Sequence, residues 1–575
     1  MTFAVRRTPE FDRIEAMPRR VLTQAHAEQC AADLTPVYAT RPGASLFPRQ
    51  GVSIAEAVAC RGAWLALPVG SGKTPISYLL PSALHAKRTL LIMKSNALAK
   101  HKTPHDFALL RREWRPPCGT LTIKTLEWLS TEAADGFLED QDPDLILLEE
   151  SDDFASTTNA AVMRLDHFIR TKRARAEAEL GVHARRDVLR VVAMTGTPIR
   201  KSLLNVWHII MWCLDTDAPL PSSPAEVKMW ALCIDEHRGR RPSPGPLGAT
   251  VQAARDWVSR RLLETPGIVA FDGDSCDAPL TIRIRLAREC AETNAQFERL
   301  LVEQESPGGI AIADPLSLAL LEDQEGVGLY SYWDPAPPDR WLNARRAFAS
   351  FSRGRIEQSQ RSSRPMYTEK QVMRRESSHP IVVEWLAVRG TFDDLANRHT
   401  AWFSRAGLDS CHDWLRSLTL PGIVFCGSVE FGRALAREAR IPYYGAAGQT
   451  DDGSSIVRAR PGRSFVASWQ ANKRGLNLQG WPRMLIVMPP PSAKWIEQII
   501  GRVHRHGQLE HVVIDLLATS GGTLDRFEKA LSEARFAKSI VGLTQKILRA
   551  DIIRVQPRVT DRNAFRWARK QQQQE

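Results

Sequence analysis

Short apolar runs, separated by turns and amphipathic stretches, recur in two parts of the chain. In residues 45–215 the runs occupy 63–67, 90–93, 145–148 and 191–194. In residues 420–547 they occupy 423–426, 465–468, 484–488 and 512–516. Runs that are apolar at consecutive positions predict strands buried on both faces, as in a parallel sheet. The pattern therefore predicts an α/β protein with two parallel sheets covered by helices.

The chain between these two parts has a different character. Residues 238–246 are rich in Pro, Gly and Arg and predict a loop or linker. Residues 340–376 are rich in arginine and also contain Trp341, Phe348, Phe351 and Tyr367. We therefore predict five segments, which are an N-terminal extension (1–44), a first lobe (45–215), a linker with a mostly helical accessory region (216–419), a second lobe (420–550) and a basic tail (551–575).

Composition narrows the class of protein. The 575 residues exceed what one compact core usually holds, and 43% hydrophobic with 25% charged residues indicates a folded chain. A net charge of +12 favours a polyanionic partner but says nothing about the fold. The nine cysteines form no CxxC pair, which indicates a reducing compartment and no structural metal. Without a run of transmembrane length or a signal-like N-terminus, we expect a cytoplasmic protein.

A phosphate-binding loop is predicted directly after the first apolar run. Residues 67–74 read Leu-Pro-Val-Gly-Ser-Gly-Lys-Thr and precede a helical stretch. Gly70 and Gly72 let successive amides around Ser71 point at phosphate oxygens, and the following helix adds its positive end. Lys73 is expected at the β- and γ-phosphates, and the Thr74 hydroxyl at Mg²⁺.

Carboxylates follow the third apolar run, at Glu149, Glu150, Asp152 and Asp153. On its own this segment could be a solvated acidic turn. With a phosphate loop upstream, Glu149 is predicted to hold Mg²⁺ and Glu150 to polarise the attacking water.

The order of motifs resembles the Swi/Snf-like branch of superfamily-2 helicases. Residues 46–50 are similar to its adenine-recognition motif, residues 194–198 to its coupling motif, and 475–478 and 498–508 to its fifth and sixth motifs. Residues 91–96 and 122–126 fall where DNA-contacting motifs are expected. The resemblance implies two RecA-like lobes with a mostly helical insertion, and an ATP- and Mg²⁺-dependent translocase or helicase that remodels forks, branched DNA or bound proteins. The absence of chromatin-binding appendages suggests a bacterial cell or a phage-infected host.

The resemblance also assigns roles to single residues. Arg502 and Arg505 would reach the γ-phosphate, and Lys94 and Thr125 would contact DNA. The coupling residues would be Thr195, Gly196 and Thr197. The residues expected to bind ATP are Gln50, Gly70, Ser71, Gly72, Lys73, Thr74, Gly475 and Gln498.

Two points remain open at the level of sequence. The family usually has Asp where this chain has Glu149, and we expect Glu149→Asp to match or exceed the native turnover because Mg²⁺ demands near-octahedral geometry. In the accessory region, Arg345, Arg346, Arg353 and Arg355 could face DNA phosphates, or they could form a charged helical face whose aromatic residues pack inward.

Two other functions are compatible with these motifs. If Glu149 has removed turnover, the protein would be a nucleotide-gated DNA-binding or scaffold protein. An RNA-directed helicase of the same superfamily is the second alternative, and stimulation of ATP hydrolysis by DNA or by RNA separates it from the first hypothesis.

Overall fold

The computed structural model describes residues 4–94, 103–182, 184–236, 239–273, 276–288, 290–303, 305, 312, 315–360, 362, 364–472, 476–490 and 492–554. The chain divides into two compact units, each assembled from three segments. Unit 1 comprises Met1–Ser275, Ala349–His379 and Ala534–Gln545. Unit 2 comprises Cys276–Phe348, Pro380–Glu533 and Lys546–Glu575.

A six-stranded parallel sheet forms the centre of unit 1, in the order β3-β2-β4-β5-β1-β6. Its strands are β1 (Ala63–Ala66), β2 (Arg88–Met93), β3 (Thr120–Thr125), β4 (Leu145–Glu149), β5 (Arg190–Thr195) and β6 (Ile268–Ala270). Strand β5 lies between β1 and β4, so the loops that leave these three strands meet at one edge of the sheet.

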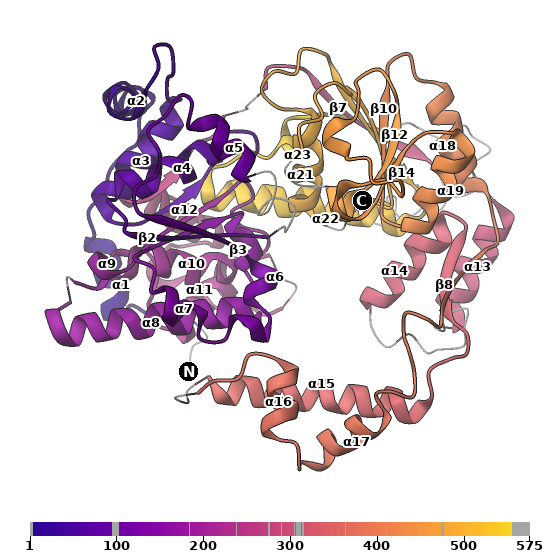
Figure 1. The fold of residues 1–575 in the computed structure, drawn as a ribbon, viewed down its shortest axis with the longest axis horizontal. Coiled ribbons are helices and arrows are strands. Elements are labelled where there is room, and N and C mark those ends of the chain that lie inside the picture. Colours follow the sequence, from indigo (N-terminus) through magenta and orange to yellow (C-terminus); the bar gives the residue numbers. More distant parts are fainter. Residues whose placement is uncertain are drawn as a thin grey trace. The chain divides into compact units, whose positions relative to one another are not determined.

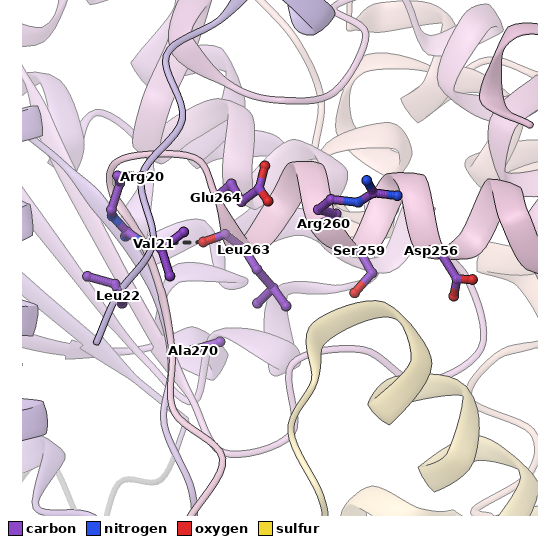
Figure 2. A pocket seen from close by; sticks show the side chains of 9 residues that line it. All are labelled: Arg20, Val21, Leu22, Asp256, Ser259, Arg260, Leu263, Glu264 and Ala270. Atoms are coloured by element: carbon purple, nitrogen blue, oxygen red, sulfur yellow. Dashed lines mark hydrogen bonds between the residues drawn. The ribbon is translucent and has the colours of Figure 1, made fainter. Parts of the chain in front are cut away.

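Both faces of this sheet are buried, which explains the unbroken apolar runs. Trp64, Ile146 and Ala193 belong to a core that includes residues of helices α8 and α10, whereas Leu65 and Leu147 belong to a second core with residues of α3 and α4. Successive side chains of a strand point to opposite faces, so strands such as β2, β4 and β5 supply both cores. Figure 1 shows α3 and α4 on one side of the sheet and α8 and α10 on the other.

Most helices of unit 1 connect or flank these strands. They are α1 (Pro9–Ala16), α2 (Gln24–Tyr38), α3 (Pro48–Cys60), α4 (Lys73–Ala83), α5 (Thr103–Leu110), α6 (Leu126–Leu129), α7 (Phe137–Gln141), α8 (Ala160–Leu180), α9 (Ala184–Val188), α10 (Leu204–Leu214), α11 (Pro224–Ile234), α12 (Val251–Leu263) and α16 (Glu369–Arg375). A 3₁₀ turn, η3 (Ser151–Phe154), follows β4.

A seven-stranded parallel sheet forms the centre of unit 2, in the order β11-β12-β10-β13-β14-β7-β15. Its strands are β7 (Leu280–Leu286), β10 (Gly422–Cys426), β11 (Tyr443–Tyr444), β12 (Phe465–Ser468), β13 (Arg483–Val487), β14 (Val512–Ala518) and β15 (Asp551–Arg554). Strands β8 (Leu329–Trp333) and β9 (Arg398–Trp402) form a separate antiparallel pair.

The helices assigned wholly to unit 2 are α13 (Ala291–Glu303), α14 (Pro315–Gly326), α17 (Pro380–Val388), α18 (Ala406–Arg416), α19 (Val429–Ala439), α20 (Trp469–Asn472), α21 (Ala493–Val503) and α23 (Lys546–Arg549). Two 21-residue helices, α15 (Asp339–Ser359) and α22 (Gly521–Val541), begin in unit 2 and end in unit 1.

The prediction of an α/β protein with parallel sheets is confirmed, and strands form at all eight predicted positions. The region 216–419 also supplies strands, since β6 joins the first sheet and β7 the second. None of the described helices is long and apolar enough to cross a membrane.

Candidate functional site

The loop after β1 has the backbone conformation that its glycines were expected to permit. Gly70 and Gly72 have φ angles of 88° and 78°, in the left-handed region that favours glycine. Lys73 is the first residue of α4 and Thr74 the second. The hydroxyl of Ser71 is buried and has no hydrogen-bond partner among the described residues. The loop and the helix start thus form a cradle with a buried polar group and a cationic side chain.

Gln50 closes one side of this loop. Its Nε2 donates a 3.0 Å hydrogen bond to the carbonyl oxygen of Gly72, and its Oε1 accepts a 2.9 Å bond from the amide of Phe47. A Cβ added to Gly72 would lie 2.4 Å from Gln50 Nε2. The side chain expected to read the base therefore also holds the end of the phosphate loop.

The carboxylates at the end of β4 and directly after it lie beside α4. Ser77, one helical turn after Lys73, donates a 2.9 Å hydrogen bond to Oε1 of Glu149. The next residue, Glu150, has a φ of 51°, and its Oε1 lies 3.8 Å from Nζ of Lys73. The structure thus brings the predicted ammonium and both predicted carboxylates to one edge of the sheet.

Asp152 joins the acidic segment to the end of β5. Its two carboxylate oxygens accept 2.8 Å hydrogen bonds from the hydroxyls of Thr195 and Thr197. Gly196, between them, packs closely on the loop after β1, because an added Cβ would lie 2.7 Å from Cγ2 of Val69. The three predicted coupling residues therefore contact both the acidic segment and the phosphate loop.

A histidine on α10 forms a hydrogen bond to the end of the acidic segment. Nε2 of His208, on α10, lies 2.7 Å from the carbonyl oxygen of Phe154 and must donate, since the carbonyl only accepts. Burial lowers the pKa of His208, which favours the neutral ring. The sequence analysis assigned no role to His208 or to Ser77. The four-residue spacing from Lys73 could have indicated Ser77, but sequence does not show which strand end it faces.

The residues present fit a nucleoside triphosphate with Mg²⁺. A phosphate would meet the loop amides, Lys73 and the start of the eleven-residue helix α4. The metal could be held by Thr74 and Glu149 together with phosphate oxygens and water, which is how Mg²⁺ is usually bound. Within the described part of the chain, no group of three or more His, Cys, Asp or Glu side chains is placed to hold a metal by itself.

In unit 2, the two predicted arginines hold a neighbouring loop. Arg502, 6% exposed, donates from Nε to the carbonyl oxygen of Gln498 at 2.9 Å and from Nη1 to that of Leu476 at 3.3 Å. Arg505 is half-buried and donates from Nη1 to the same Leu476 oxygen at 3.2 Å and to Oδ1 of Asn477. Gly475 lies outside the described residues. The segments 476–478 and 498–508 are therefore joined through Leu476.

Three buried side chains close to these arginines in the sequence or the fold, His504, Lys546 and Glu497, were given no role in the sequence analysis. Nε2 of His504 lies 2.7 Å from the carbonyl oxygen of Ala278, and its Nδ1 lies 3.1 Å from Nζ of Lys546. The Lys546 amide in turn donates a 2.6 Å bond to Glu497. These contacts attach the end of α21 to the segment before β7 and to α23.

The predicted DNA contacts of unit 1 differ in their surroundings. Nζ of Lys94 lies 3.6 Å from Asp153 and its side chain is 39% exposed. Thr125 is buried, and its hydroxyl caps α6 by accepting a 3.1 Å bond from the amide of Trp128. The role of both residues in DNA binding stays a prediction.

Trp341, Phe348 and Phe351 of the accessory segment pack against other rings, whereas Tyr367 lies under the guanidinium group of Arg164. Trp341 lies edge-on to Trp385 with 5.7 Å between centroids, and Phe348 stacks on Trp385 at 5.9 Å. Of the four arginines, Arg346 and Arg353 are exposed, Arg345 lies over Trp385, and Arg355 pairs with Glu376. The last two thus have partners within the protein, while the first two face solvent.

No protein-family model matches this chain, and a search of curated proteins finds no relative.

Proposed function

We propose that the protein is an ATP-dependent DNA translocase or helicase of the superfamily-2 type, with units 1 and 2 acting as two RecA-like lobes. The observation that carries the proposal is the arrangement of side chains at one edge of the first sheet. There the glycine loop, Lys73 at the start of α4, and the carboxylates Glu149 and Glu150 come together, and Lys73 and Glu150 are 3.8 Å apart.

Bound ATP with Mg²⁺ would supply the phosphoanhydride bond whose hydrolysis drives movement. Lys73 would neutralise the β- and γ-phosphates, and Ser71 and the loop amides would donate to phosphate oxygens. Thr74 and Glu149 would hold the metal, and Glu150 would accept a proton from the attacking water or orient it. Gln50 contacts the base and keeps the Gly72 end of the loop in place.

In this proposal Arg502 and Arg505 of unit 2 would supply the cationic charge that stabilises the transition state. The contact of both guanidinium groups with Leu476 supports a shared role, since a shift of either one disturbs the same carbonyl. Asp152, Thr195 and Thr197 transmit the state of the nucleotide site to the rest of unit 1. Sequence-independent contacts with phosphates along a DNA duplex suit a chain of net charge +12.

The test is ATP hydrolysis by the full-length protein, measured without nucleic acid and with duplex, forked, four-way-junction and single-stranded DNA and with RNA. We expect stimulation by DNA that falls steeply with salt and depends little on sequence. Lys73→Ala should abolish it, whereas Lys87→Ala, which removes an exposed lysine of the same unit, should not. Stimulation by RNA alone would favour the RNA-directed helicase. ATP binding without turnover would favour the nucleotide-gated binder, and retained turnover in Lys73→Ala would reject the phosphate-loop assignment.

A further inference from the structure

Glu149 and Ser77 form a pair that the sequence pattern does not predict. Ser77 lies on α4 four residues after Lys73 and is fully buried. Its hydroxyl oxygen is 2.9 Å from Oε1 of Glu149 and 3.4 Å from the carbonyl oxygen of Lys73. A hydroxyl has one proton to donate, and the shorter distance favours the carboxylate.

The length of the glutamate side chain is needed for this contact. Glu149 is the last residue of β4 and is paired with Met194 on β5, so its Cα is fixed by the sheet. An aspartate at the same Cα would draw the carboxylate back by about one carbon–carbon bond, ~1.5 Å. The oxygen–oxygen distance would then exceed the hydrogen-bonding range unless α4 moved.

The hydrogen bond fixes the position of the Glu149 carboxylate. The bond restricts the Glu149 side chain, which is longer and more flexible than that of aspartate, so less entropy is lost when a metal binds. Donors behind a metal-binding carboxylate commonly change metal affinity by about 10- to 100-fold when they are removed.

We propose that Ser77 is a positioning residue for the Glu149 carboxylate and fits this longer side chain to a divalent cation bound with nucleotide. The inference rests on the proposed function, because it requires a metal–nucleotide complex in the cradle of unit 1. The role of Ser77 reverses the expectation that Glu149→Asp matches or exceeds the native turnover. The shorter side chain loses the Ser77 contact, so metal affinity should fall.

The test measures the affinity of the full-length protein for Mn²⁺ in the presence of a non-hydrolysable ATP analogue. The electron paramagnetic resonance signal of free Mn²⁺ reports how much of the metal is bound. Ser77→Ala should weaken Mn²⁺ affinity by about 10-fold or more and leave metal-free binding of the analogue nearly unchanged. Ser53→Ala is the matched control. Ser53 is a buried serine whose hydroxyl bonds to the carbonyl oxygen four residues earlier, at 2.6 Å, so its removal should not alter Mn²⁺ affinity.

Glu149→Asp completes a double-mutant cycle. In that background Ser77→Ala should change Mn²⁺ affinity by less than about twofold, because the contact is already lost. Equal losses in both backgrounds, or a loss no larger than that of Ser53→Ala, would overturn the role of Ser77 while leaving the proposed function intact. If the native protein binds no nucleotide with or without Mn²⁺, the proposed function fails and the role of Ser77 fails with it.

Discussion

The carboxylate of Asp152 accepts a 2.8 Å hydrogen bond from the hydroxyl of Thr197. The other carboxylate oxygen accepts an equivalent bond from Thr195, and all three side chains are buried. One side chain thus fixes the segment after β4 to the end of β5. In a motor, this junction would transmit any displacement of the acidic segment to the loop that follows β5.

Replacing Asp152 with Ala should lower the free energy of unfolding of unit 1 by about 2–4 kcal/mol, because two buried hydroxyls lose their acceptor. It should also lower DNA-stimulated ATP hydrolysis more than nucleotide binding. Urea denaturation and nucleotide titration measure the two effects. Asp451→Ala, at an exposed carboxylate of unit 2, is the control. Unchanged stability in Asp152→Ala would show that the two threonines find other acceptors.

Gly72→Ala should combine backbone strain with a clash. An alanine at φ 78° costs about 1–2 kcal/mol, and its Cβ would displace Gln50 Nε2. Gly43 has a φ of 90° with nothing within 4 Å of an added Cβ, so Gly43→Ala separates the strain from the clash. We expect both variants to lose stability and only Gly72→Ala to lose nucleotide affinity. Equal nucleotide affinity in the two variants would contradict the role of Gln50.

Arg505→Ala should reduce turnover by about 10³-fold or more and leave nucleotide affinity largely intact, since its charge acts on the transition state. Arg416→Ala removes a side chain of unit 2 that is 76% exposed and should change neither quantity. Steady-state hydrolysis and equilibrium nucleotide binding provide the comparison. Loss of affinity with normal turnover would show that Arg505 binds the ground state instead.

Glu325 on α14 should make unit 2 less stable as pH rises. Burial raises the pKa of its carboxyl from 4.5 to about 7, against the favourable charge of Arg299. Between these values the unfolded chain releases a proton that the folded chain retains. The free energy of unfolding should therefore fall with rising pH, by at most about 1.4 kcal/mol per pH unit for this group.

Asp323 contributes in the same direction, since burial raises its pKa to about 7 although it pairs with Arg526. Glu325→Gln should therefore make the pH dependence shallower without removing it. Glu430→Gln, at an exposed carboxylate of the same unit, is the control. Urea denaturation at pH 5, 6 and 7 measures the slopes, and identical slopes for the native protein and Glu325→Gln would refute the assignment.

Eight of the strands could be predicted because each contains a run of buried and almost entirely apolar residues, as at 145–148 in β4. The phosphate loop could be predicted because Gly70 and Gly72, followed by Lys73 and Thr74, lie between an apolar run and a helical stretch. Strand β3 was harder to recognise, since Thr120, Thr122 and Lys124 make its sequence polar at the edge of the sheet. The bond from Ser77 to Glu149 and the junction at Asp152 depend on which strand ends are neighbours, and this order is not encoded in any local pattern.

The division of the chain among the two units has a consequence for its synthesis on the ribosome. The core of unit 1 contains Trp64 and Leu148 but also Phe536 and Ile540, which follow strand β14 of unit 2 in the sequence. Unit 1 therefore cannot complete its core until the polypeptide as far as Ile540 has emerged, although its sheet can pair far earlier. In the interval, the apolar surface that Phe536 and Ile540 later cover is open to chaperones and to neighbouring nascent chains.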